Sequence, residues 1–502
     1  MDQGMWFNGT NIRTNTVPSA AMSTHVNSRE MSTNDLPSKI PNAGLVRQIS
    51  SAILVSTMTI YAGMVVGWIS PVSIALRSHD SPVGIMDKID IAILATCANY
   101  FEIFGSLFYG FLAKNYGRKI GLLCVGIPSA VGGVFLTFAT SRATLFVGRI
   151  TTGFASIGGI NLAPMYVSET VHESIRGMLM SSWTFQAGVL LSYTFGKLLS
   201  YQGFNSIMIA IPALTSMMVI WLPETPYFLA VQGRHEDALK AILWFRNNDE
   251  RIARLEMENI KPRDEKTLTL LQTLRTSVTR KALLISVTAV ALQTLSGIHG
   301  ILNYAAIIFE EAGSPFSPED SSILVGILIV VSSLISTVVI DKIGRKPLLY
   351  ASFTLCGITM AVLSAFLYLR KIGLDVGHLG WVPVASIGTF VSAYGLGLGV
   401  VPSILTNEIA PVSIKPVVSS LVGASAMVLV ILVVQSFPFL DDYLGLYSCF
   451  TLPAIFNFIG ILFTRCLVPE TKGKTLTEIA NELGRKGKAN VVESKPEEDP
   501  MI

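Results

Sequence analysis

The sequence predicts an all-α integral membrane protein with twelve transmembrane helices in two pseudo-symmetric six-helix bundles. Of its 502 residues, 51% are hydrophobic and only 14% are charged, and the mean hydropathy is +0.55. This composition is far more apolar than that of a typical soluble domain. Successive apolar segments also reach the length of about 20 helical residues that crosses a bilayer.

Twelve such segments follow one another with short breaks after residue 51. They fall near 51–76, 89–113, 120–140, 143–168, 177–201, 204–222, 281–310, 321–340, 347–369, 379–407, 416–440 and 444–467. The first fifty residues are polar, which predicts a disordered tail without a cleaved signal peptide. The predicted organisation is therefore an N-terminal tail over 1–50, a bundle over 51–222, a helical linker over 223–280, a second bundle over 281–467 and a C-terminal tail over 468–502.

Basic residues predict the orientation of the chain in the membrane. With both termini in the cytosol, the inner connections and tails hold about thirty Lys and Arg, in agreement with the positive-inside rule. The outer connections then hold only Arg77, Lys88, Arg142, Arg370 and Lys371. We therefore expect a multi-pass protein, placed in the plasma membrane, with cytosolic termini.

An internal repeat supports two homologous halves. KNYGRK at 114–119 recurs as DKIGRK at 341–346, and PET at 223–225 recurs as PET at 469–471. Glu169 precedes Arg176 by seven residues, as Glu408 precedes Lys415. The three pairs keep one order along the chain, so two related bundles are expected to face each other.

The repeated charges predict ion pairs at the cytosolic boundary, where partial desolvation strengthens them. Such pairs would hold the cytosolic opening between the halves closed, and they would break when the halves rotate relative to each other. The alternative is that the basic residues only set topology. The candidate gate residues are Arg118, Lys119, Glu169, Arg176, Glu224, Asp341, Arg345, Lys346, Glu408, Lys415 and Glu470.

The stretch QTLSGIHGILNY, residues 293–304, is unusually polar for a membrane helix. On a continuous helix its polar positions share an arc of about 140°, and they comprise Gln293, Ser296, His299, Gly300, Asn303 and Tyr304. Such groups have no hydrogen-bond partner in hydrocarbon, which predicts that they face a watery cavity. Gly297 and Gly300 favour a local break there. The alternative is that these side chains only join neighbouring helices.

The ordered motifs resemble the sugar porter family of the major facilitator superfamily. They are GRITTGFASIGGINLAPMYVSE, PETPYFL, QTLSGI, DKIGRK, NEIAP and PETKGKTL, over roughly residues 50 to 480. Within that family, PMYVSE and the polar N-terminal tail are most similar to insect facilitated trehalose transporters and their relatives. The resemblance implies alternating access, in which a cavity between the halves binds a sugar and opens to one side at a time.

The resemblance also implies which residues bind the sugar. The family's QQLSGIN segment corresponds to positions 293–299, and donor–acceptor amides suit sugar hydroxyls. The implied ligands are Gln186 on the fifth span and Gln293, Thr294, Ser296, His299, Asn303 and Tyr304 on the seventh. Where family members usually carry polar residues, this chain has Ile329, Gly395, Ala426, Met427 and Val430.

Energy coupling is expected to be absent. Proton-coupled sugar porters carry an acid in the first span, where this chain has Ile69. Glu102 nevertheless lies inside the second span, where a charge is costly and should be paired, protonated or facing water. Glu102 and His299 are thus candidates for a proton-sensitive site. The alternative is that both side chains only form hydrogen bonds and do not titrate. Arg149 is expected to pair or snorkel near the outer side.

These observations predict a facilitative carrier of hexose or trehalose. The alternatives are a transport-poor nutrient sensor on the same scaffold and proton-coupled symport of a related polyol-like solute. The expected partners are a small sugar and the lipid bilayer, with the chain working as a monomer. We expect no nucleic-acid partner, cofactor or metal site, and no enzyme activity, because the sequence shows no zinc-like spacing and no nucleophile–base set.

Overall fold

The computed structural model describes residues 44–79, 81–172, 183–260, 277–313, 316–374, 377–409 and 415–472, with isolated positions 175, 176, 179, 474 and 478. Every regular element in these ranges is helical. Eleven of the helices are long and apolar enough to span a bilayer. The fifth predicted span corresponds to α7, of which sixteen residues are described. The all-α membrane class predicted from composition and hydropathy is confirmed.

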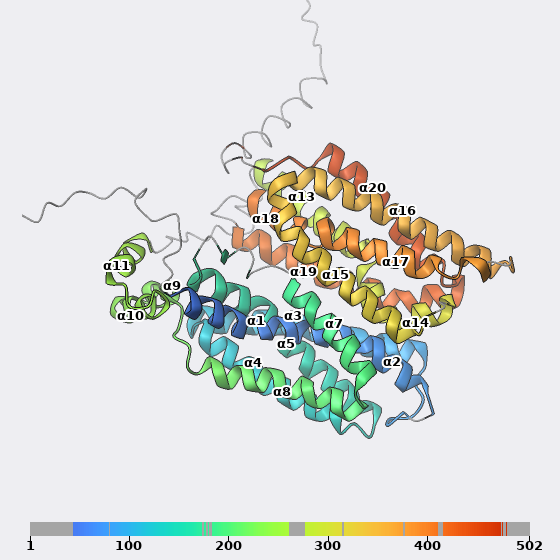
Figure 1. Ribbon diagram of the computed structural model, residues 1–502, viewed down its shortest axis with the longest axis horizontal. Helices are drawn as coiled ribbons and strands as arrows, with labels where there is room; N and C mark the ends of the chain where they lie inside the picture. The colour runs from blue at the N-terminus through green and yellow to red at the C-terminus, as the bar shows by residue number, and fades with distance from the viewer. Residues whose placement is uncertain are drawn as a thin grey trace, which may run out of the picture. The chain divides into compact units, whose positions relative to one another are not determined.

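The described residues of the N half form seven helices, drawn blue to green in Figure 1. They are α1 (Leu45–Gly67), α2 (Ile69–Arg77), α3 (Lys88–Asn115), α4 (Arg118–Thr137), α5 (Arg142–Thr170), α7 (Trp183–Leu198) and α8 (Tyr201–Val219). α5 packs on α1, α3 and α4, and α1 also packs on α7. The first span is divided into α1 and α2 by a turn at Trp68.

The described part of the linker, up to residue 260, forms three short helices, α9 (Pro226–Val231), α10 (His235–Phe245) and α11 (Glu250–Asn259). α10 explains why α1 begins at Leu45, six residues before the predicted span. Arg47 donates to the Trp244 carbonyl at 3.0 Å and lies over its indole ring, while Gln48 donates to the Phe245 carbonyl at 3.4 Å. The extra turns of α1 are thus held by the linker rather than by lipid.

The C half, yellow to red in Figure 1, repeats the arrangement with more interruptions. Its elements are α13 (Ser277–Leu295), α14 (Ile298–Ala312), α15 (Pro318–Ile343), α16 (Arg345–Lys371), η2 (Gly377–Leu379), α17 (Val382–Ala393), η3 (Tyr394–Leu398), α18 (Val401–Ile409), α19 (Lys415–Leu444) and α20 (Ser448–Cys466). The seventh predicted span is therefore α13 followed by α14, and the tenth is α17 and α18 joined by the π-helical turn η3. π-turns of this kind are frequent at functional sites.

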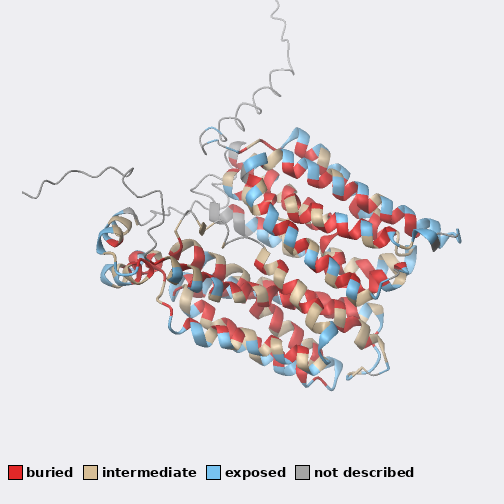
Figure 2. Ribbon diagram, in the orientation of Figure 1, coloured by how far each residue is buried: buried red, intermediate tan, exposed pale blue. Residues whose placement is uncertain are grey.

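The distribution of apolar side chains is that of a membrane protein. Many large apolar residues are exposed on the outward faces of the helices, as the pale blue outer surfaces in Figure 2 show. They include Leu107, Ile127, Trp221 and Leu462, each more than 60% exposed. In a soluble protein such patches would be aggregation-prone, whereas here they meet hydrocarbon.

The two halves touch mainly along three helix pairs, α3 with α19, α7 with α15, and α2 with α14, and α1 also touches α14. We call the end at which the linker helices lie the linker end. The opposite end, where α2 and α14 finish and α3 begins, is the far end (Figure 1).

Candidate functional site

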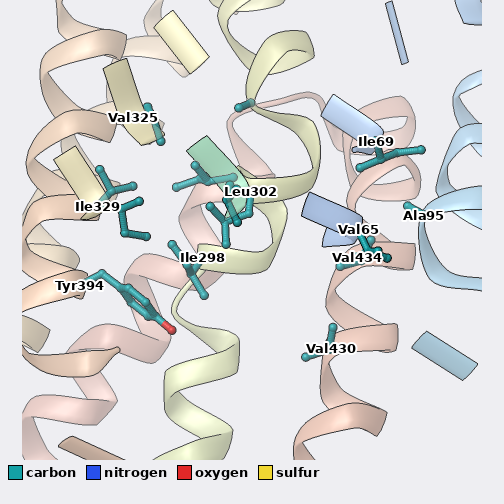
Figure 3. Packing of buried hydrophobic residues seen from close by; sticks show 14 of the residues in the cluster. Val65, Ile69, Ala95, Ile298, Leu302, Val325, Ile329, Tyr394, Val430 and Val434 are labelled. Carbon is teal, nitrogen blue, oxygen red and sulfur yellow. The ribbon is translucent and has the colours of Figure 1, made fainter. Parts of the chain in front are cut away.

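A cavity of about 90 Å³ lies between the two halves. Its walls come from six helices, with Val65, Val66, Ala95, Ala98, Asn99, Glu102, Arg149, Ile160 and Phe185 from the N half and His299, Leu302, Asn303, Met427 and Val430 from the C half. Val65, Ala95, Leu302 and Val430 are labelled in Figure 3. The space is large enough for several waters, and its polar groups are amides, a carboxyl, a guanidinium and an imidazole.

Glu102 is the acidic group of this cavity. It is 5% exposed, and the Ser156 hydroxyl donates a hydrogen bond to its Oε1 at 3.1 Å. Glu102 comes from α3 and Ser156 from α5, two helices of the N half that pack closely. The carboxyl therefore faces a polar cavity and not lipid. A charged side chain in hydrocarbon has a high free energy, and facing a cavity is one way to avoid it.

Arg149 is buried beside the same cavity and does not snorkel, although snorkelling is one of the two outcomes expected from sequence. It is 1% exposed, and it donates from Nη1 to the Val65 carbonyl at 2.8 Å and from Nε to the Leu94 carbonyl at 3.4 Å. Its guanidinium lies 4.9 Å from the centroid of the Trp68 ring. The Val65 and Leu94 carbonyls and the Trp68 ring together hold the charge inside the N half.

The polar stretch of span 7 does not form one continuous face. Gly297 adopts φ 105°, a left-handed conformation that ends α13 and starts α14. His299 and Asn303 line the cavity, but Gln293 donates to the Tyr394 hydroxyl at 3.2 Å inside the C half. The single polar arc expected from a continuous helix is therefore wrong, because the helical phase changes at the break.

The remaining residues of the stretch contact the C half itself. Thr294 donates to the Val290 carbonyl and Ser296 to the Gln293 carbonyl, both within α13 and its end. Tyr304 donates to the Val434 carbonyl at 3.0 Å and stacks on Phe437 at 4.8 Å. The alternative interpretation, bonding between packed helices, therefore describes Tyr304, whereas Thr294 and Ser296 bond within their own helix.

A second distortion of span 7 involves residues that the sequence did not single out. Tyr304 has non-helical φ and ψ, which kinks α14. An unbroken helix would join the Leu302 carbonyl to the Ala306 N–H. Here Tyr193 donates to that carbonyl at 2.7 Å and Ser70 accepts from that N–H at 3.1 Å, both from the N half. A Tyr on α7 and a Ser after the first-span break carry no sequence signal for this contact.

Gln186 and the apolar replacements take different positions relative to the cavity, and only some of them line it. Gln186 is 8% exposed and its Oε1 has no hydrogen-bond partner among the described residues. Met427 and Val430 line the cavity, whereas Ile329 packs in the apolar cluster behind it (Figure 3). Ala426 instead packs with Val290, away from the cavity. The C half therefore supplies its polar groups to the cavity from α14 and apolar ones from α19.

The predicted gate residues form ion pairs, but within each half. Arg118 donates to Glu169 Oε1 from Nη2 at 2.7 Å and from Nε at 3.1 Å. The related Arg345 donates to Glu408 Oε1 at 3.0 Å. Both pairs join two helices of the same half at the linker end. The expected latch between halves is therefore not what these described residues form.

Glu224 and Glu470, from the repeated PET motifs, cap helix N-termini. Glu224 accepts from the N–H groups of Arg118 and Lys119 at the start of α4, and Glu470 from those of Arg345 and Lys346 at the start of α16. Lys119 and Lys346 donate to the Ile220 and Arg465 carbonyls. The charges of the repeat thus fasten the last helix of each half to the turn after its second span.

Burial raises the pKa of Glu224 above its usual value, since the backbone donors offset it only in part. Burial also acts on Glu470, but four backbone N–H donors outweigh it and lower the pKa of that carboxyl. Arg176 donates to the Val171 carbonyl at 3.1 Å. The side chains of Asp341 and Lys415 lie outside the described residues.

The family model described as "Sugar (and other) transporter" matches residues 49–483. The chain belongs to the sugar (and other) transporter family. It is 28% identical to a Drosophila sechellia protein named facilitated trehalose transporter Tret1-2 homolog, over 89% of this chain and 93% of that protein. It is 31% identical to the Aedes aegypti facilitated trehalose transporter Tret1 over 76% of this chain.

The chain spans about half the length of that Aedes relative, 48%. Among solved structures, the inward open conformation of the xylose transporter XylE from E. coli matches with a TM-score of 0.70 at 20% identity, over 87% of this chain and 99% of XylE. That likeness shows that the chain shares the fold of XylE. The sequence-based assignment to this family is confirmed.

Proposed function

We propose that this member of the sugar transporter family carries a hexose or trehalose across the plasma membrane by facilitated alternating access, with both termini in the cytosol. The observation that carries the proposal is the cavity that both halves build together. The names of the insect relatives support trehalose as the first substrate to test. A single copy embedded in lipid suffices for this function, and no catalytic step is required.

The cavity has the chemistry that a sugar needs. Asn99 from α3, with His299 and Asn303 from α14, contributes groups that give and take hydrogen bonds. We propose these three as ligands, together with Gln186, whose oxygen has no partner among the described residues. Gln293 donates to the Tyr394 hydroxyl in this structure, so we propose that it reaches the sugar only after the halves move. Thr294, Ser296 and Tyr304 keep the break and the kink in place. Apolar walls from Val65 and Val430 suit the C–H faces of a sugar ring.

The size of the cavity indicates that the halves must move. Its volume of about 90 Å³ is below the roughly 300–1,000 Å³ of ordinary ligand pockets. Substrate therefore enters only when the halves separate at one end, as alternating access requires.

Uptake of labelled trehalose and glucose into oocytes tests this proposal. We expect saturable flux that Asn303→Ala reduces at least tenfold, because one lost sugar hydrogen bond leaves buried groups unpaired. Asn407→Ala is the matched control, since Asn407 is exposed and donates only to Ser403 in its own helix. Equal loss in both variants would contradict a ligand role for Asn303.

A transport-poor sensor on the same scaffold is the second candidate. It is favoured by Met427 and Val430, which present an apolar wall to the cavity from α19. Sugar binding to the purified protein, with no flux of either sugar in cells that display it at the surface, would support the sensor over the carrier.

A further inference from the structure

Three groups of ion-pair contacts, each built on one cation, join the two halves at the far end. Lys88, at the start of α3, lies 2.6 Å from Asp441 Oδ2, 2.9 Å from Glu311 Oε1 and 4.0 Å from Asp442 Oδ1. Arg77 lies 3.8 Å from Glu310, and Lys197 pairs with Asp320. These contacts follow the same three helix pairs along which the halves touch.

The signs of the charges are divided between the halves. In each of the three groups the N half supplies the cation and the C half supplies the acid. The other ion pairs among the described residues, such as Arg142–Asp90 at the same end and Arg118–Glu169 at the linker end, stay within one half or its linker. Complementary charge of this kind brings two surfaces together and fixes their register.

Lys88 is the centre of this arrangement. Its partner Asp441 is 11% exposed and Glu311 is 24% exposed, whereas Glu310 and Asp320 are more than half exposed. Partly buried pairs are screened less by salt and solvent than exposed ones. One ammonium between two carboxylates from α14 and α19 also ties both helices to α3.

We propose that Lys88 is the hub of an electrostatic latch that holds the far end closed, and that its pairs with Asp441 and Glu311 break each time the cavity opens to that side. The latch rests on the proposed alternating-access function. Because these pairs exist in one access state and are lost in the other, their strength sets the populations of the two states. Lys88 acts on transport by positioning the halves, at the end of the bundles opposite the linker-end ion pairs.

Accessibility of a cavity cysteine tests the latch without relying on flux. Val430→Cys places a thiol in the cavity wall, and a membrane-impermeant thiol reagent is applied from each side of oriented proteoliposomes. With Lys88→Met added, we expect labelling from the far-end side to rise roughly three- to tenfold, as expected for loss of one partly buried ion pair. The matched control is Arg142→Met, which removes a cation at the same end whose partner Asp90 belongs to the same half.

A charge exchange guards against a merely structural effect. The double variant Lys88→Asp with Asp441→Lys should return labelling toward the starting rate, whereas each single variant raises it. Equal labelling in Lys88→Met and Arg142→Met, or no recovery in a well-expressed exchange variant, would overturn the proposal. Because labelling is measured without sugar, a result against the latch would not refute sugar transport. Conversely, the latch could be present in a protein that transports no sugar.

Discussion

Arg149 shows how a charge is kept inside the membrane-spanning part of this chain. Its guanidinium is enclosed by the N half, where two backbone carbonyls and the Trp68 ring replace water. Arg is suited to this role because its planar fork meets separated acceptors and stacks on an aromatic face. The charge is therefore a structural tie between α5, α1 and α3 at the edge of the cavity.

Replacing Arg149 by Lys should destabilise the fold although the charge is retained. An ammonium loses one carbonyl contact and most of the stacking on Trp68, which we expect to cost about 2 kcal/mol. Thermal unfolding in detergent, followed by the loss of the monodisperse species, measures the effect. Arg142→Lys, on an exposed pair, serves as the control, and an equal shift in both would refute the tie.

A variant at Glu102 distinguishes facilitated diffusion from proton-coupled transport. For a facilitator, Glu102→Gln should leave downhill trehalose flux within about twofold of the wild type, because the amide keeps the contact with Ser156. Flux should also be insensitive to a protonophore. Uptake driven by an imposed pH gradient in the wild type and lost in Glu102→Gln would show that this carboxyl carries the proton instead.

At the scale of the helix, span 7 depends on its two interruptions. The left-handed Gly297 separates α13 from α14 and changes the phase of the polar residues. The kink at Tyr304 presents one carbonyl and one N–H to the N half. Together they place His299 and Asn303 at the cavity while Gln293 points into the C half.

Gly297→Ala should therefore weaken both stability and transport. An alanine at φ 105° is strained by about 1–2 kcal/mol, and its Cβ would lie 3.0 Å from Pro453 Cβ. Gly423→Ala is the matched control in α19, where an added Cβ meets nothing within 4 Å and should stabilise the helix by about 0.5–1 kcal/mol. Thermal midpoints that shift alike in the two variants would contradict the account of the break.

The capping glutamates predict a pH dependence. The lowered pKa of Glu470 means that its contribution to stability is present above its unfolded pKa, about 4.3, and is lost as pH falls through the folded pKa. We expect Glu470→Gln to be less stable at neutral pH and to lose less on acidification. Glu224→Gln should cost less at neutral pH, since burial raises the pKa of Glu224. Thermal midpoints between about pH 3 and 7 measure both effects, and an identical pH dependence of the two variants would contradict the opposite pKa shifts.

At the scale of the whole molecule, most of the fold could be predicted because it follows from hydropathy and repetition. The apolar segments have the length that a bilayer dictates, and the paired GRK and PET motifs mark the same turns in both halves. The family assignment rested on the same motifs and is confirmed by a match over residues 49–483.

The details of the site could not be predicted because they depend on packing between distant helices. No local pattern states that Gly297 takes a left-handed conformation and not a helical one, so the polar arc was drawn on a continuous helix. Nor does the repeat state whether Arg118 pairs within its half or across, since Glu169 and Glu408 are equally suitable in sequence. Tyr193 and Ser70 gain their roles only from the kink in α14.

Counterflow in proteoliposomes tests the central claim most directly, namely that a cavity between the halves carries a sugar from one side to the other. Vesicles holding the purified chain are loaded with unlabelled trehalose and diluted into a trace of labelled trehalose. We predict a transient accumulation of label that is retained with a protonophore and greatly reduced in Asn303→Ala. Sugar binding without any exchange of label for trehalose or glucose would contradict the claim.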